Sequence, residues 1–280
     1  MKTYIGRRNF ITLLGSAAVT LPLAACAQQG GRAQALLNRI LHMQAEYAAA
    51  SIRQFISGIE GHIGWTVQLP WSAGTIDQRR FDCLRLLRQV PAITEVAQLD
   101  AAGIEQLRVS RLSADVVATK ADFSQDPKFT VAMAKKVYYG PLYFRERGPV
   151  ESRVSEPYMT LSLAGARPDA GVSVAELNLK MLWDVVSKIK LAERDVTYIL
   201  DAQGQLVAHS DISLVLLKVD MTRLAHVQAA RAASGVSTAP VQVAQNISGG
   251  DVLTTYAAIA PLGWLVFVEL PAEEANTLAQ

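Results

Sequence analysis

Tyrosines gather in one short part of the chain, where they could line a pocket. The chain has eight tyrosines, and four of them lie within 21 residues: Tyr138, Tyr139, Tyr143 and Tyr158. A phenol offers a flat apolar ring and a hydroxyl that both donates and accepts hydrogen bonds. Side chains of this kind suit the walls of a small-molecule pocket. They equally suit strands that pack aromatic rings into a core, and the sequence leaves both interpretations open.

The residue types of a hydrolase triad occur together at His209-Ser210-Asp211. Neighbours in a strand point to opposite faces, so these three cannot line up as nucleophile, base and orienting acid, and we expect a turn at a strand end. The four histidines show no metal-ligand spacing, and the sequence has no Cys-x-x-Cys pair, EF-hand loop, Walker A motif or Gly-rich dinucleotide turn. We therefore predict that the protein is not an enzyme and that it holds no metal and no cofactor.

The first 26 residues have the pattern of an export signal. Arg7-Arg8 precedes a weakly apolar stretch that ends at Leu23, which is the twin-arginine pattern of proteins exported already folded. Leu23-Ala24-Ala25-Cys26 is similar to a lipobox, in which the cysteine sulfur receives a diacylglyceryl group before cleavage. We predict a periplasmic protein with a lipid anchor on Cys26; the alternative is ordinary cleavage near Ala27.

The charge that remains after the leader limits the classes of partner. Residues 1–25 hold Lys2, Arg7 and Arg8 and no acid, so 24 basic residues face 25 acidic ones and the net charge falls from +2 to −1. A near-neutral chain has neither the footprint of a nucleic-acid-binding protein nor a polybasic membrane patch. We predict that nucleic acid is not a partner.

Helical periodicity dominates the segment after the leader. Apolar residues recur every three or four positions from Arg32 to about Gly64, which predicts one long amphipathic helix. Thr75 and Gln78 stand in capping-box spacing and predict a second helix that ends at Pro91. Residues 32–79 are thus predicted to form a stalk helix and connector. Either the protein's own modules or a twin helix in a homodimer could cover the apolar stripe of the stalk.

Strand patterns follow in two units, residues 80–190 and 191–272, before a predicted C-terminal tail at 273–280. The first unit is expected to have strands at 95–99, 104–109, 137–144, 158–164 and 172–177 and helices at 124–136 and 179–189. The second is expected to have strands at 197–200 and 205–209 and a buried strand pair within 257–270. The charged stretch from Arg145 to Arg153 is expected to be a solvated loop.

Short matches suggest that the two units are copies of one plan. Leu-Asp-Ala-x-Gly occurs at 99–103 and again at 200–204, an offset of 101 residues. Tyr158 and Glu176 have counterparts in Tyr256 and Glu269, at offsets of 98 and 93. Matches in the same order favour a tandem duplication. The predicted fold class is α+β, with an antiparallel sheet and helices in each unit.

A long helix followed by two hairpin-rich units resembles the double Cache sensor domain, in which two PAS-like modules stand on one stalk helix. The strings that carry the resemblance are Gln68-Leu-Pro-Trp-Ser72, Asp122-Phe-Ser-Gln-Asp-Pro127, Ser155-Glu-Pro-Tyr158-Met-Thr, Ala175-Glu-Leu-Asn178-Leu and Asp201-Ala-Gln-Gly-Gln-Leu-Val-Ala-His209. They are similar to the extracytoplasmic sensor regions of bacterial histidine kinases and adenylate or guanylate cyclases. The similarity covers about residues 34–272.

The resemblance implies a small-molecule site in the membrane-distal module, here the first unit. In amino-acid-binding members an Arg and two aromatics hold the carboxylate, and an acid on a later strand holds the ammonium. The matching segment reads Lys136-Val-Tyr138-Tyr139, and the later acid falls at Glu176. A lysine still offers a cation to a carboxylate but lacks the two-pronged guanidinium fork. With Tyr143 and Tyr158 these form the expected ligand-binding set, although the echo at Glu269 favours a partly architectural role for the acid.

Two functions fit these observations. The first is a non-catalytic periplasmic sensing domain for a small molecule such as an amino acid, an amine or a carboxylate, with output through a separate membrane partner. The alternative is a periplasmic solute-binding lipoprotein of a transporter. Solute-binding proteins alternate βα units in two parallel-sheet lobes, whereas the strands expected here come as hairpins.

Overall fold

The structure, a computed structural model, describes residues 23–68, 73–147, 154–190, 192–233 and 238–278. Most of the predicted leader and the side chain of Cys26 lie outside the described part, so the prediction of lipidation is not addressed by the fold. Among the residues that are described, no helix combines the length and the apolar character that a bilayer span requires.

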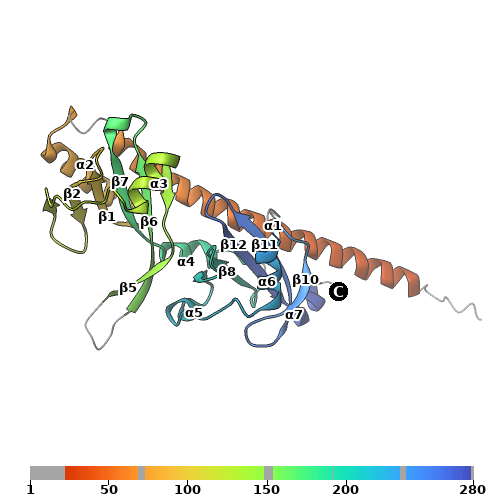
Figure 1. Cartoon of the computed structure of the whole chain (residues 1–280). Helices are drawn as coiled ribbons and strands as arrows, with labels where there is room; N and C mark the ends of the chain where they lie inside the picture. The colour runs from red at the N-terminus through yellow and green to blue at the C-terminus, as the bar shows by residue number, and fades with distance from the viewer. Residues whose placement is uncertain (1–22, 69–72, 148–153, 191, 234–237, 279–280) are drawn as a thin grey trace, which may run out of the picture.

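One helix, α1 (Leu23–Gly64), runs along the whole molecule beside two sheets (Figure 1). The side chains that it buries recur at three- and four-residue steps, as the sequence pattern requires for one helical face. They include Leu37, Leu41, Ile52, Ile59 and Ile63, each no more than 5% exposed. The predicted long helix is thus confirmed over residues 32–64.

The other helices are short and begin at caps that the sequence supplies. Thr75 accepts a hydrogen bond from the backbone N–H of Gln78 at the start of α2, and Asp126 accepts one from Lys128 at the start of α3. The bounds are α2 (Ile76–Gln89), α3 (Pro127–Lys135), α4 (Met181–Val186), α5 (Ile212–Leu216), α6 (Ala225–Ala232) and α7 (Ala272–Leu278). The predicted C-terminal tail, residues 273–280, overlaps α7, and Ala275 is buried where α7 meets α1 and the second sheet.

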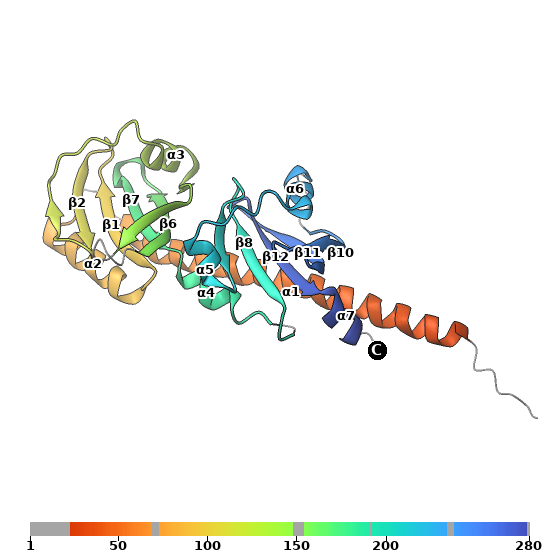
Figure 2. The same ribbon diagram turned by 90° about the horizontal axis from the view of Figure 1, so that it is seen from below.

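The first sheet is antiparallel and has the strand order β3-β2-β1-β7-β6-β4, with β5 also paired to β6. Its strands are β1 (Ile93–Leu99), β2 (Glu105–Ser110), β3 (Val116–Val117), β4 (Val137–Tyr139), β5 (Tyr143–Arg147), β6 (Val154–Ala164) and β7 (Val172–Asn178). We call the part of the chain that carries this sheet the first module. Helices α1 and α2 cover one face of the sheet, and α3 covers part of the other (Figure 2).

The second sheet is also antiparallel, in the order β10-β11-β12-β8-β9. Its strands are β8 (Val196–Leu200), β9 (Leu206–His209), β10 (Gln242–Gln245), β11 (Asp251–Ile259) and β12 (Trp264–Pro271). We call this part of the chain the second module. Helix α1 again lies on one face, and α6 lies on the other (Figure 2). The predicted α+β class with two antiparallel sheets is confirmed.

The two modules repeat one hairpin in detail. Asp100 and Asp201 each accept hydrogen bonds from backbone N–H groups two and four residues later, and each is followed by a glycine with positive φ, +83° at Gly103 and +87° at Gly204. A bulge falls at Gln98/Leu99 in one module and at Ile199/Leu200 in the other. The offset of 101 residues is therefore a structural correspondence as well.

The first unit has the additional short strand β3, its strand β6 begins earlier than predicted, and one predicted strand is divided. The expected strand 137–144 divides into β4 and β5, because Pro141 has no N–H for a ladder and Gly140 sits tightly against Thr160 on β6. The backbone N–H of Gly140 donates to the carbonyl of Thr160 at 2.8 Å. This break lets β5 leave the position of β4 and pair with the beginning of β6.

Candidate ligand-binding site

A row of polar side chains crosses the face of the first sheet that α1 does not cover. Glu95 on β1, Glu176 on β7 and Thr160 on β6 are register partners on three neighbouring strands. Register partners point to the same face, so the three side chains stand side by side. Their chain neighbours Val96 and Ala175 point the other way, into the core beneath α1.

Glu176 is the centre of this row. Its carboxylate accepts hydrogen bonds from the hydroxyl of Thr160, at 3.0 and 3.1 Å, and from the hydroxyl of Tyr143 on β5. Burial raises the pKa of Glu176 above its ordinary value, and the nearby charge of Glu95 adds to this, although the two hydroxyls and Arg145 oppose it. A carboxylate that is half-buried and already oriented is well placed to bind a cationic group.

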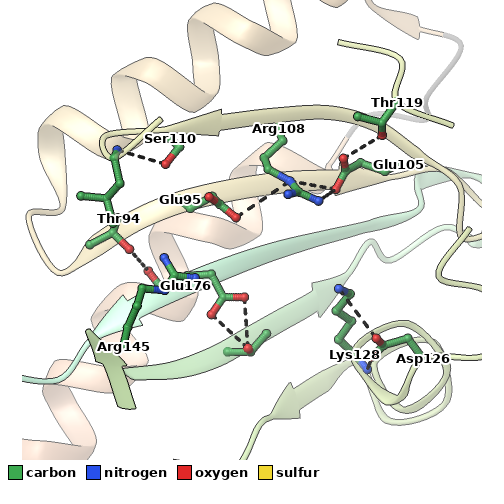
Figure 3. Close-up of polar contacts among 12 residues, drawn as sticks. Thr94, Glu95, Glu105, Arg108, Ser110, Thr119, Asp126, Lys128, Arg145 and Glu176 are labelled. Atoms are coloured by element: carbon green, nitrogen blue, oxygen red, sulfur yellow. Dashed lines mark hydrogen bonds and ion pairs between the residues drawn. The ribbon is translucent and has the colours of Figure 1, made fainter. Parts of the chain in front are cut away.

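A guanidinium lies over the aromatic rings beside Glu176. The Cζ atom of Arg145 is 5.0 Å from the ring centroid of Tyr158 and 5.9 Å from that of Tyr143. Figure 3 shows Arg145 beside Glu176. Tyr158 is fully buried, and its hydroxyl accepts a hydrogen bond from Asn178 at 3.2 Å. Arg145 thus offers a half-buried cation with fixed aromatic support.

A second guanidinium comes from β2. Arg108 donates to Glu105 at 2.6 Å and lies 3.9 Å from Glu95, and the hydroxyl of Thr119 also donates to Glu105 (Figure 3). Burial lowers the pKa of Arg108, but the charges of Glu105, Glu95 and Glu176 outweigh it and the net shift is upward. Glu105 therefore holds Arg108 in place next to the row.

Tyr138 lies on the same face, near the start of α3. It is the register partner of Ser162 on β6, two positions from Thr160. Burial raises the pKa of Tyr138, and the charges of Asp126 and Glu176 raise it further. The ring of Tyr138 packs against the apolar cluster that joins Phe129 of α3 to Val174 of β7, on the same face as Glu176.

Four of the six predicted ligand-binding residues come together on this face: Tyr138, Tyr143, Tyr158 and Glu176. Tyr139 does not, because it is the next residue on β4 and points to the opposite face, where its hydroxyl donates to Glu60 of α1 at 2.6 Å. Lys136 does not either, since its ammonium donates to the carbonyl of Gly165 at 3.2 Å. Ala164, the register neighbour of Lys136, is four residues along β6 from Thr160, or about 13 Å. The structure therefore places Lys136 and Tyr139 apart from the other four residues.

Four other residues of this site are not predicted from the sequence. Thr160, Glu95 and Arg108 stand on strands whose faces become known only with the register, and their alternation with buried residues was the available signal. The sequence predicts a solvated loop at Arg145, but this residue belongs to β5 and is only half exposed. Glu151 and Arg153, from the same predicted loop, lie outside the described residues.

The arrangement offers charged groups of both signs. Two carboxylates and two guanidinium groups stand on one face of the sheet, which offers an anion for an ammonium group and a cation for a carboxylate or similar anion. Within the described residues, no group of three or more His, Cys, Asp and Glu side chains could hold a metal ion. His209 and Asp211 are parts of a turn, where Asp211 caps α5 by accepting from Ser213.

A groove of about 530 Å³ lies between the start of β5 and the second module. Leu142, Tyr143 and Phe144 line one side, and the β8–β9 turn with the residues around Lys218 and Asp220 lines the other. The ammonium of Lys218 lies 4.7 Å from the ring centroid of Phe144. Tyr143 therefore touches Glu176 on one side and the groove on the other.

Comparisons with solved structures find sensor domains over nearly the whole chain. The extracellular domain of soHK1S-Z6, described as a histidine kinase, is 17% identical, with 90% of this chain and 99% of that chain covered at a TM-score of 0.61. The ligand-binding domain of the Campylobacter jejuni chemoreceptor Tlp3, in complex with L-norvaline, is 14% identical, with 90% and 93% covered at 0.57. That of the Pseudomonas aeruginosa PAO1 amino acid chemoreceptor PctB, in complex with L-Arg, is 15% identical, with 86% and 90% covered at 0.59.

Sequence comparisons add nothing to this. No protein-family model matches the chain, and no curated protein matches it. The shared element is the fold: a long N-terminal helix and two antiparallel, PAS-like modules. The resemblance stated from the sequence is confirmed at this level, and the chain has the fold of the double Cache sensor domains.

Proposed function

We propose that the protein is a non-catalytic, periplasmic sensing domain that captures a small molecule on the Glu176 face of the first module. The observation that carries this proposal is the half-buried carboxylate of Glu176, held by the hydroxyls of Thr160 and Tyr143 beside the guanidinium of Arg145. A ligand with an ammonium group and an anionic group fits these charges. The amino acids bound by the similar domains of Tlp3 and PctB have this chemistry.

The module boundaries, the export route and the anchor belong to the same proposal. The modules would comprise residues 80–190 and 191–272, and export would use the twin-arginine leader. Cys26 would carry the lipid that holds the protein at a membrane. Incorporation of labelled palmitate into the wild-type chain, and its loss in Cys26→Ser, would support the anchor; equal labelling of both would refute it.

Output would pass through a separate membrane partner, and α1 offers a surface for a second copy of the chain. Leu36, Met43 and Tyr47 are 59, 57 and 67% exposed on the side of α1 away from both sheets. With Ile40 between them they follow the alternating four- and three-residue steps of a coiled-coil seam. We include a homodimer through this stripe in the proposal.

The alternative function, a solute-binding lipoprotein, has less support. Such proteins are built from two lobes with parallel sheets, whereas every strand pair in both sheets described here is antiparallel. A sensor needs a ligand that binds two states of the protein with different affinity. A movement of β5 on ligand binding could be passed to the second module, whose residues line the other side of the groove.

The test is thermal unfolding of the purified chain with a panel of amino acids, amines, short carboxylates, purines and sugars. A ligand at 100 times its dissociation constant adds about 2.7 kcal/mol to the free energy of unfolding, which raises the midpoint by several degrees. The shift should require an ammonium group on the ligand and should vanish in Glu176→Gln. Glu146→Gln, which changes an exposed glutamate on β5, is the matched control. No shift with any compound, or a shift that survives Glu176→Gln, would refute the proposal.

A further inference from the structure

The second module contains a counterpart of the Glu176 position. Glu95, four residues before Leu99, is the register partner of Glu176; Val196, four residues before Leu200, is the register partner of Glu269. On the other side, Thr160 is paired with Glu176, and Thr254 is paired with Glu269. Glu176 and Glu269 therefore occupy the same place in two copies of one sheet.

The tyrosine match suggested by the sequence does not survive this comparison. Tyr158 precedes Thr160 by two residues, but Tyr256 follows Thr254 by two, so the two tyrosines lie on opposite sides of the acid. The correspondence in the structure rests on the Leu-Asp-Ala-x-Gly hairpin and on the threonine–glutamate register pair of each sheet.

Glu269 is fully enclosed with two partners from its own module. The hydroxyl of Tyr198 donates to Oε1 of Glu269 at 2.7 Å, and Nε2 of His226 lies 3.0 Å from the same oxygen. The hydroxyl and Nε2 are 2.9 Å apart, so the three atoms form a compact triangle. His226 and Glu269 are each 3% exposed, and Tyr198 is 0% exposed.

Large side chains fill the space that the first module lines with small ones. Ala97 and Val174 are the register partners next to Glu176, and their counterparts next to Glu269 are Tyr198 and Phe267. The rings of Tyr198 and Phe267 stack with centroids 5.1 Å apart, and the ring of His226 meets Phe267 edge-on at 5.7 Å. Next to Glu269 the second module thus places aromatic rings of its own sheet, whereas Ala97 and Val174 next to Glu176 are covered by Phe129 and Ala132 of α3.

The enclosed cluster contains buried polar atoms that make no hydrogen bond in the described part of the structure. Among the described residues, neither Nδ1 of His226 nor Oγ1 of Thr254 has a hydrogen-bond partner, and both are shielded from solvent. A buried polar atom without a partner is costly, so a core that was apolar from the start would not contain them. The equivalent threonine in the first module, Thr160, bonds directly to its acid.

We propose that His226 is the built-in occupant of a former ligand site in the second module. Its imidazole N–H binds Glu269 at the place where, under the proposed function, a ligand's ammonium binds Glu176. The Glu269 position is therefore closed to external ligands, and the cluster holds α6 against the sheet through His226, Val227 and Ala230. The class of compound that this site takes, once its own histidine is removed, is a small aromatic ring with an N–H donor, of the imidazole type.

Chemical rescue tests this assignment on the full chain. His226→Ala removes a group of almost the size and chemistry of free imidazole. We expect the midpoint of thermal unfolding to fall by several degrees, and millimolar imidazole to restore at least half of the loss. His62→Ala changes an exposed histidine on α1. Its midpoint of thermal unfolding should not fall by a comparable amount, and imidazole should not raise it. The double variant His226→Ala/Glu269→Gln should lose the rescue.

Two outcomes would overturn the assignment: an unchanged midpoint in His226→Ala, or a lowered midpoint that imidazole does not raise. If His226→Ala does not fold, the refolding yield with and without imidazole is the readout, and equal yields would overturn it as well. The ligand of the first module is measured separately in the same variant. Its shift should persist, so failure of the proposed function and failure of this inference remain distinguishable.

Discussion

The hydroxyl of Tyr139 donates a hydrogen bond of 2.6 Å to Glu60 of α1, while its neighbour Tyr138 faces Glu176 on the other side of the sheet. A strand of three residues, β4, therefore touches the candidate ligand site on one face and the stalk helix on the other. Burial raises the pKa of Tyr139, and the hydrogen bond and charge of Glu60 raise it further, so the phenol remains a donor at neutral pH. A displacement of β4 by a ligand would be transmitted to α1 by this contact.

We predict that Tyr139→Phe lowers the free energy of unfolding by about 0.5–1.5 kcal/mol, because it removes one hydrogen bond and keeps the ring. The ligand-induced shift of the midpoint should be retained. Urea unfolding with and without ligand measures both. Tyr138→Phe is the matched control on the same strand, and it should change the ligand shift more than the stability. The reverse pattern would place the ligand on the α1 face.

We predict that Glu176→Gln stabilises the protein at neutral pH. The folded state raises the pKa of this carboxyl, so the folded protein holds the proton at a pH where the unfolded chain has released it. Stability therefore falls as the pH rises from the ordinary glutamate value through the raised one, and the deficit persists above it. The advantage of the glutamine variant should appear over this window and disappear at lower pH. Urea unfolding between pH 4 and 7.5 measures it, and an advantage independent of pH would contradict it.

We predict that the exposed stripe of α1 joins two copies of the chain. Met43→Lys with Tyr47→Lys should shift the protein from dimer to monomer in sedimentation experiments, because each introduces a charge into an apolar seam. Arg39→Ser, also exposed on α1, is the control and should leave the dimer intact. A wild-type chain that is monomeric at 100 µM would refute the homodimer.

We predict that Gly171→Ala is far more destabilising than Gly249→Ala. Both glycines have positive φ, +74° and +82°, so both variants carry a backbone strain of about 1–2 kcal/mol. A Cβ at Gly171 would lie 2.1 Å from the carbonyl oxygen of Leu99, whereas one at Gly249 would meet nothing within 4 Å. Gly171 precedes β7, so its variant should also weaken the ligand response. Equal losses in urea unfolding would contradict this account.

The sequence predicted the elements whose signals are local. The three- and four-residue steps from Leu37 to Ile63 define α1, and the Asx turns at Asp100 and Asp201 define the two hairpins, because each depends only on neighbours along the chain. The repeat at an offset of 101 residues then led correctly to two similar sheets.

The site was predicted only in part, because its composition depends on strand register. Tyr138 and Tyr139 are adjacent in sequence, and the sequence alone could not show which of them faces Glu176. Arg145 became a site residue only because the break at Gly140 and Pro141 redirects β5 toward the start of β6. Similarly, Glu269 has the same place in its sheet as Glu176, but His226 already contacts its carboxylate. His226 lies on α6, a helix that the sequence pattern does not predict.

The buried side of α1 belongs to a single hydrophobic core that includes Leu161 and Ala175 of the first sheet as well as Val266 and Val268 of the second. Neither module has a separate core on that side. Deletion of either module would expose apolar side chains of α1 to water, so we expect the two modules to unfold together. A change in what one module binds must therefore leave this shared face of the helix covered.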